Sequence, residues 1–233
     1  QYSLRPGKRD VLIELFDREF VETQEAEGMA VLGQFRDLDR PDRFVWLRGF
    51  TDMASRAQAL TSFYTGPVWK ANSAQANATM IDCDNVLLLR PVTSSRGFPS
   101  PTAQRPPAGH NAPPPSSCLL ATICYSDPPF GDELLGFFDS HARPVLASAG
   151  ITPLACFQTE YAENTFPALP VRTGENVFAW FTLFSSRAHL SDYLDWLDRP
   201  GPWRDQVRPR LSAMISREPE QLKLSPTARS LLR

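Results

Sequence analysis

Two arginines in the first half of the chain occur in stretches that have the composition of buried strands. Arg36 lies in residues 30–37 and Arg48 in residues 43–50, and both stretches alternate apolar or aromatic side chains with others, as strands do. A guanidinium group removed from water needs a carboxylate, a set of carbonyl oxygens or an anionic ligand, because an unpaired buried charge is costly. The two arginines are therefore candidates for holding a carboxylate or an enolate oxygen of a small ligand.

Nearby aspartates offer a simpler alternative for these two charges. Arg36 and Arg48 could pair with carboxylates of the same half, or reach solvent at the end of the sheet. The available partners are Asp37, Asp39, Asp42, Asp82 and Asp84.

Other chemistries find little support in the residue types. No nucleophile-elbow, P-loop or G-x-G-x-x-G string occurs, so hydrolase, nucleotide-triphosphatase and dinucleotide-binding mechanisms are not indicated. Three histidines and four cysteines show no zinc-ligand spacing, and we expect neither a metal nor a cofactor. The cysteines, which we expect to be reduced and mostly buried in a cytoplasmic protein, are Cys83, Cys118, Cys124 and Cys156.

The net charge and the hydropathy pattern exclude two partners. A formal net charge of −2 gives no electrostatic attraction to nucleic acid or to an anionic membrane. The longest apolar runs are far too short to span a bilayer. We therefore expect a small-molecule ligand as the partner, and no nucleic acid or membrane.

The elements that must position the candidate residues follow a β-α-β-β-α-β order, the split βαβ unit. Gly28 is expected to end the first helix and Asp52 to cap the next. In the first half, strands are predicted over residues 2–4, 30–37, 43–50 and 80–90, and helices over 8–25, 53–64 and 68–78. In the second half, strands are predicted over 119–125, 151–160, 176–184 and 221–224, and helices over 132–148, 187–197 and 203–216.

The two halves repeat one another. Adding 122 carries Phe16 to Phe138 and Gly28 to Gly150, whereas adding 134 carries Trp46 to Trp180, along with many similar pairs. The change of offset locates a 12-residue insertion in the second half, near residues 162–174. Two copies of one unit are therefore predicted.

A Pro- and Ser-rich segment separates the copies. Residues 93–117 contain few core-forming side chains, so this segment cannot bury enough surface to offset its ordering entropy. We predict a first domain over residues 1–92, a disordered linker over 93–117 and a second, degenerate domain over 118–233.

Three strings of the first half resemble a known family. They are GQFRDLDRPDRFVWLRGF from Gly33, FYTGPVW from Phe63 and ANATMIDCDNVLLL from Ala76. With them, the chain resembles a bacterial NIPSNAP protein. The resemblance implies the dimeric α/β-barrel fold, an α+β class in which two ferredoxin-like sheets pack face to face, and it supplies no catalytic residues. The halves are then expected to pair either within one chain, as a pseudo-dimer, or in a homodimer.

In the implied barrel, alternate residues of the strand 43–50 should face the helices and the barrel interior. Small and aliphatic residues suit the helix side, so Val45, Leu47 and Gly49 are predicted to face the helices. The opposite face is then predicted to line the barrel interior, with Tyr64 at its mouth. The predicted ligand-binding residues are Arg36, Arg48, Trp46, Gln34, Phe50 and Tyr64, whereas the catalytic residues stay unassigned. In the repeat, Arg48 corresponds to Thr182 and Arg36 to Gln158, so both charges belong to the first half alone.

Three hypotheses of function remain open at this point. The first is an enzyme that isomerises, or oxygenates without a cofactor, a small organic acid or phenolic metabolite in a barrel pocket of the first half. The second is a ligand-binding or protein-interaction module with a filled barrel core and an exposed apolar patch. The third is a haem protein. The residues predicted for the patch are Phe137, Phe138, Phe166 and Leu169.

Overall fold

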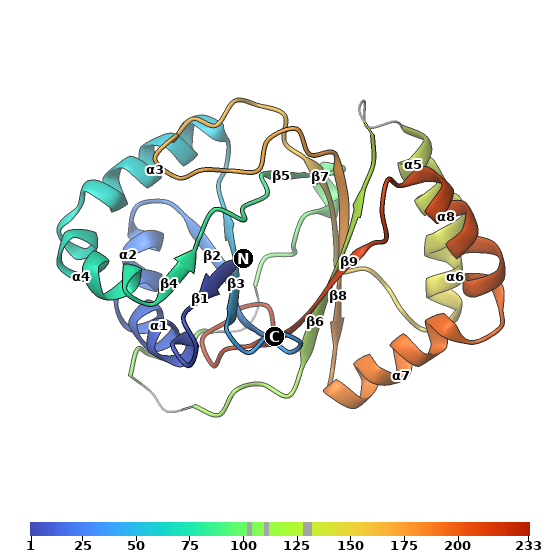
Figure 1. Ribbon diagram of the computed structural model, residues 1–233, viewed down its shortest axis with the longest axis horizontal. Helices are drawn as coiled ribbons and strands as arrows, with labels where there is room; N and C mark the ends of the chain where they lie inside the picture. The colour runs from blue at the N-terminus through green and yellow to red at the C-terminus, as the bar shows by residue number, and fades with distance from the viewer. Residues whose placement is uncertain (102–103, 110–111, 128–131) are drawn as a thin grey trace.

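The two halves of the chain form one sheet that closes on itself. The computed structural model describes residues 1–101, 104–109, 112–127 and 132–233. Within these residues, nine strands pair antiparallel in the order β4-β1-β3-β2-β9-β6-β8-β7-β5. The outermost strands are consecutive in the chain, since β4 ends at Asp82 and β5 begins at Leu89. The sheet therefore returns to its start as a barrel, with the helices of each half on its outside (Figure 1).

The first half keeps the predicted order with one correction. Its strands are β1 (Tyr2–Leu4), β2 (Ala30–Asp37), β3 (Arg43–Gly49), β4 (Met80–Asp82) and β5 (Leu89–Pro91). Its helices are α1 (Arg9–Leu15), α2 (Val21–Ala26), α3 (Met53–Thr65) and α4 (Pro67–Asn77), with the π-helical turn η1 (Phe16–Phe20) joining α1 to α2.

The single strand predicted over residues 80–90 is wrong. The chain leaves the first sheet at Asp82, whose carboxylate accepts from the backbone N–H of Asp84 (2.9 Å), and Val86 donates its N–H to the Asp84 carbonyl (2.8 Å). These turns interrupt the ladder, because the segment must pass from β1, its partner in the first half, to β7 in the second.

The second half repeats the first. Its strands are β6 (Cys118–Tyr125), β7 (Ala155–Thr159), β8 (Val177–Phe184) and β9 (Glu220–Pro226). Its helices are α5 (Asp132–Phe137), α6 (Arg143–Ser148), α7 (Arg187–Asp198) and α8 (Arg208–Met214), with π-helical turns η3 (Phe138–Ala142) and η4 (Trp203–Val207). The turn η3 lies 122 residues after η1, which is the offset of the repeat.

The halves pair reciprocally within one chain. The last strand of the second half, β9, pairs with β2, and the last strand of the first half, β5, pairs with β7. The intrachain alternative for how the halves pair is therefore confirmed. None of the described helices is long and apolar enough to cross a membrane.

The barrel interior is filled by apolar side chains from both halves. Its buried cluster includes Phe35, Val45, Leu119, Leu222 and Leu232, which are 0 to 5% exposed. Leu47 and Leu32 pack against the same cluster. The interior is thus a core and not an open chamber.

The predicted orientation of β3 is wrong. Val45 and Leu47 face the barrel interior, whereas Phe44 and Trp46 pack with the helix layer of the first half. The helix layer accepts them because it is itself aromatic: the ring of Phe16 lies 5.5 Å from that of Phe44 and 4.9 Å from that of Trp46. Aliphatic side chains instead fill the narrow space between the two sheets.

A bulge in β2 also changes the predicted alternation. The register against β3 shifts between Val31 and Gly33, so Leu32 and Phe35 both face the interior although they are three residues apart. Gln34 and Arg36, which lie opposite Trp46 and Phe44 on β3, therefore face the helices.

Two arginines outside the repeat fasten the linker and the C-terminal residues to α2. Arg105 donates to the Glu25 carboxylate (2.8 and 2.9 Å), to the Val31 carbonyl (2.6 Å) and to the Arg229 carbonyl (2.8 Å). Arg229, which is 3% exposed, donates to the Pro106 carbonyl (2.9 Å) and pairs with Glu22. The predicted disorder of residues 93–117 stays a prediction, and its residues 102–103 and 110–111 lie outside the described part of the chain.

Because Phe35 of β2 lies in the barrel interior, we expect its truncation to destabilise the protein. Phe35→Ala removes a ring that is fully buried between the halves, so the free energy of unfolding should fall by about 3–5 kcal/mol. Denaturant unfolding measures this loss. Ile81→Ala, at a side chain that is 65% exposed, is the control and should change stability by less than about 0.5 kcal/mol. A loss below about 1 kcal/mol for Phe35→Ala would contradict a core shared by both halves.

Asp17 predicts a pH dependence of stability. Burial raises the pKa of this carboxyl to about 6 against the charges of Arg229, Arg36 and Arg105, and its Oδ1 is buried without a hydrogen-bond partner among the described residues. The folded state therefore binds the proton more tightly than the unfolded chain, so stability falls as pH rises from about 4 to about 6.

Asp17→Asn removes this titration. Relative to the wild type, the variant should gain on the order of 1–3 kcal/mol at pH 7 and little at pH 4. Denaturant unfolding at the two pH values measures the difference, and an equal effect of the substitution at both would contradict the burial of this carboxylate.

Candidate functional site

The six predicted ligand-binding residues do not meet inside the barrel. Arg36 pairs with Asp10 of α1 through its Nη2 (2.7 Å) and Nε (3.0 Å) at the outer surface. An aspartate partner was the simpler expectation for this charge, although Asp10 was not among the carboxylates considered. Gln34 is fully buried, and neither polar atom of its side chain has a hydrogen-bond partner in the described chain.

The other four gather in the helix layer of the first half. The Arg48 guanidinium lies 4.5 Å from the Trp46 ring centroid and 5.4 Å from that of Phe50. Tyr64 stands on α3, with its ring 4.8 Å from that of Trp69. The two arginines differ in their contacts, because among the described residues Arg36 pairs with a carboxylate and Arg48 donates to a neutral amide. A ligand contact of any of the six stays a prediction.

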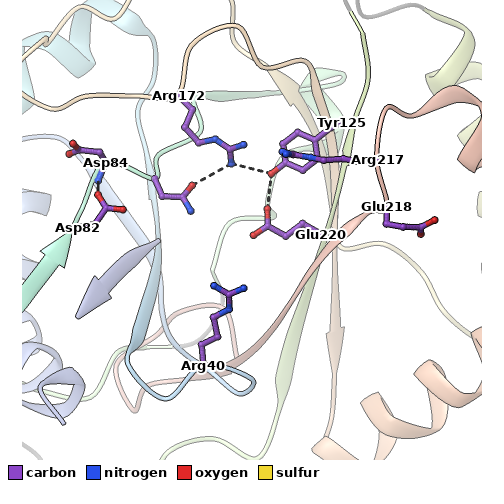
Figure 2. Close-up of a pocket in the computed structure, with 9 residues that line it drawn as sticks. Arg40, Asp82, Asp84, Tyr125, Arg172, Arg217, Glu218 and Glu220 are labelled. Carbon is purple, nitrogen blue, oxygen red and sulfur yellow. Dashed lines mark hydrogen bonds between the residues drawn. The ribbon is translucent and has the colours of Figure 1, made fainter. Parts of the chain in front are cut away.

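An open cavity lies at one mouth of the barrel, where the halves meet. Its volume is about 610 Å³, which is the size of many small-molecule sites. Its walls come from the β2–β3 turn, the β4–β5 crossing, the end of β6, the loop before β8 and the chain entering β9 (Figure 2). The lining residues are Arg40, Asp82, Asp84, Asn85, Tyr125, Arg172, Arg217, Glu218 and Glu220.

A hydrogen-bonded set of three side chains forms one wall. The Tyr125 hydroxyl, at the end of β6, donates to the Glu220 carboxylate (2.7 Å) and accepts from Arg172 Nη1 (3.1 Å). Arg172 also donates to Glu175 through Nε (3.0 Å) and to Asn85 Oδ1 (3.4 Å). These contacts fix Arg172 between the two halves, since Asn85 belongs to the β4–β5 crossing.

Burial and charge set the protonation of this wall. Burial first, and then the hydrogen bond to Glu220, raise the pKa of Tyr125, so its hydroxyl keeps its proton at neutral pH. Burial lowers the pKa of Arg172, but hydrogen bonds to Tyr125 and Glu175 outweigh it and raise that pKa overall. The wall therefore presents a protonated phenol, a carboxylate and a permanent cation.

Two further arginines face the cavity. The Arg217 guanidinium lies 3.5 Å from the centroid of the Tyr125 ring, a cation–π contact. Arg40, on the β2–β3 turn, extends into the cavity from the side opposite Arg172 (Figure 2). Arginines on two walls can hold the carboxylate of a small ligand, with Glu220 and Tyr125 beside it to exchange a proton.

None of the residues that line this cavity was predicted as a ligand-binding residue. Arg172 falls in the predicted insertion, and Tyr125 ends a strand of eight buried residues, which a sequence pattern attributes to the core. Polar residues directly before or after strands lie at the ends of a barrel, so their position in the sequence could have indicated this site. The prediction would have required knowing which strands of the two halves pair.

Apolar surface is scarce where the interaction hypothesis placed it. Phe137 and Phe138 are buried in the second-half core, and Phe166 and Leu169 pack against the first-half core. The predicted exposed apolar patch is therefore wrong at Phe137 and Phe138, whereas Phe166 and Leu169 are half-buried. The four cysteines are free and three of them are buried, as expected.

Solved structures share this architecture. A "putative monooxygenase" from Lactobacillus acidophilus NCFM aligns over 97% of this chain and 90% of its own, at a TM-score of 0.54 and 8% identity. A second, from Fusobacterium nucleatum subsp. nucleatum, aligns over 97% and 89% at 0.55 and 10% identity, and an "anthrone oxidase-like protein" over 97% and 88% at 0.53 and 14%. At such identities the likeness shows the fold alone, the dimeric α/β barrel.

A family model matches the first half of the chain. Residues 1–96 match the model of the NIPSNAP family, so the predicted resemblance is confirmed for this part. No curated protein matches the chain.

We expect the Tyr125 hydroxyl at the barrel mouth to contribute to stability. Tyr125→Phe removes a hydroxyl that joins Glu220 to Arg172, so the free energy of unfolding should fall by about 1–2 kcal/mol. Denaturant unfolding measures it. The matched control is Tyr64→Phe, because the contacts of Tyr64 among the described residues are those of its ring. Equal losses for both variants would contradict the wall of three side chains.

Proposed function

We propose that this protein is an enzyme that removes a proton from a small organic acid or phenolic metabolite at the barrel mouth. The observation that carries the proposal is the 610 Å³ cavity in which arginines from both halves face a hydrogen-bonded Tyr125–Glu220 pair. A carboxylate or phenolate of the substrate would lie between Arg40 and Arg172. The site differs from the pocket expected in the first half, since residues of both halves line it.

The reaction needs a base, a proton donor and charge stabilisation. In this proposal Glu220 takes a proton from a carbon next to a carbonyl group, and the electron pair stays in the enolate. Arg172 and Arg217 stabilise the enolate oxygen, and Tyr125 supplies a hydrogen bond. In an isomerisation, Glu220 returns the proton to another carbon of the same molecule, so no co-reactant is needed.

Cofactor-free oxygenation is a second reaction that the same enolate could undergo. Dioxygen, as co-substrate, accepts the enolate electrons, and a carbon–oxygen bond forms to give a hydroperoxide after proton transfer. Support for testing it comes from the fold alone, because two proteins with this architecture are each described as a "putative monooxygenase".

The filled interior favours binding without turnover as the alternative. Side chains from both halves occupy the barrel core, which the non-catalytic hypothesis requires. In that case the mouth holds a small carboxylate, and Glu220 has no role in a reaction.

A cytoplasmic location is part of the proposal and is supported by the four free cysteines. The proposal also retains the expectation of a small-molecule ligand. Assembly of whole chains into a homodimer is a separate expectation, because the pairing of halves is already met within the chain.

Carbon-bound proton exchange tests the enzyme. Pyruvate and oxaloacetate in D₂O, followed by proton NMR, report proton removal, and oxygen consumption with anthrone reports oxygenation. Glu220→Gln should lower either rate by about 10²- to 10⁴-fold and leave carboxylate binding intact. Arg40→Gln should weaken binding by about tenfold or more, the value of a charged hydrogen bond.

The controls separate the two functions. Arg199→Gln, at an exposed arginine outside the cavity lining, should change neither binding nor exchange. Binding of pyruvate without exchange or oxygen consumption would favour the non-catalytic module. Exchange that survives in Glu220→Gln would rule out the proposed base.

A further inference from the structure

A second arginine of the first-half helix layer is buried without a carboxylate. Arg56, on α3, is 4% exposed. Its Nη1 donates to Asn164 Oδ1 (2.9 Å) and approaches Thr165 Oγ1 (3.4 Å). Both acceptors are neutral and belong to the bridging segment, residues 160–176 between β7 and β8, which crosses from the second half to α3 (Figure 1).

Arg48, which is half-buried, approaches the same place from the sheet side. Its Nη1 donates to Gln24 Oε1 (2.9 Å) and contacts the Met29 sulfur (3.7 Å). Gln24 is 1% exposed and gives its own amide N–H to the Phe20 carbonyl (2.8 Å). No ion pair joins Arg48 to a carboxylate in the part of the chain that the structure describes.

The two guanidinium groups share one aromatic ring. Arg48 lies 5.4 Å and Arg56 5.9 Å from the centroid of Phe50. Burial first, and then the charge of Arg48, lower the pKa of Arg56. Two like charges are thus held near one another, in a setting that disfavours the charge of Arg56.

The repeat shows that the fold does not need these charges. At the offset of 134, Arg48 corresponds to Thr182 and Arg56 to Leu190, whereas Phe50 corresponds to Phe184. Both replacements are buried in the second half, at 3% exposure. The same helix–sheet contact is therefore built there from a neutral pair, and the two cations of the first half need another explanation.

We propose that Arg48 and Arg56 bind the oxyanion group, a carboxylate or a phosphate, of a small ligand beneath the bridging segment. Guanidinium groups favour such anions because their N–H groups form charge-assisted hydrogen bonds. Trp46, Phe50 and Tyr64 surround the site, so these predicted ligand-binding residues have their place here and not in the barrel.

Arg48 and Phe50 are half-buried, so an anion reaches the site from their exposed side. The neighbouring cavity of about 20 Å³ lies against Gln24, Trp46 and Tyr64, and neither arginine lines it. The oxyanion is therefore placed at the guanidinium groups and not in this cavity. Phe166 stacks on Tyr64, at 5.8 Å between ring centroids and 24° between planes, and so covers the site from the bridging segment.

Thermal unfolding in the presence of inorganic phosphate or acetate tests this site. The ionic strength is held constant with chloride, and the chain is otherwise intact. Phosphate, acetate or both should raise the Tm of the wild type in a saturable way. A response to acetate alone indicates a carboxylate ligand, and one to phosphate alone a phosphorylated one. No saturable rise with either anion would overturn the proposal.

The repeat supplies the variants. Arg48→Thr with Arg56→Leu installs the residues of the second half, and the double variant should bind the anion at least tenfold more weakly. Arg56→Leu alone should raise the Tm without anion, because it replaces an unpaired buried charge with an apolar side chain. An anion response of unchanged strength in the double variant would also overturn the proposal.

Variants at the barrel mouth keep the two sites apart. Arg40→Gln should retain the anion-dependent rise in Tm, since Arg40 lines the other cavity. A rise that disappears in Arg40→Gln and persists in the double variant would place the anion at the mouth and overturn the second site. Failure of the exchange assay leaves this result unaffected, because the two experiments use different residues and readouts.

Discussion

The reciprocal pairing of β2 with β9 and of β5 with β7 is the interaction on which the rest of the structure depends. Each half on its own is a sheet with helices on one face, and its other face is apolar. Pairing the last strand of each copy with the second strand of the other leaves only the short strands β4 and β5 as edges of the described sheet. It also brings the two apolar faces together, so Phe35 of the first copy is buried beside Leu224 of the second.

Closure also determines where polar chemistry can lie. Because side chains fill the interior, charged groups gather at the barrel mouth and behind the sheet. At the mouth, Arg40 and Asn85 of one copy meet Tyr125 and Glu220 of the other. Behind the sheet, the bridging segment brings Asn164 against Arg56. Both places bring together residues from the two copies.

Much of the fold could be predicted from local patterns. The repeat offsets, the left-handed Gly28 and Gly150 and the side-chain caps at Asp52 and Ser186 are local signals, and the structure has them. The faces of β3 could not be predicted in this way, since both are apolar and only the partner layers decide between them. Gln34 and Arg36 were placed wrongly for the same reason, because they share the face of Trp46 and Phe44, whereas the bulge in β2 turned Leu32 to the opposite face. The mouth depended on contacts between residues up to 95 apart, such as Tyr125 and Glu220, and no periodicity reports those.

The π-helical turn η1 has a geometric consequence for the first copy. It holds one more residue per turn than the helices around it, so Phe16 and Phe20 both point at the aromatic layer, with centroids 6.0 Å apart. Deleting one residue from η1 would let α1 and α2 merge into a regular helix and would rotate α2 by about 100° about its axis. Gln24 would then swing away from Arg48. One extra residue in a helix thus sets the direction from which the Arg48 guanidinium of the adjacent sheet meets the amide oxygen of Gln24.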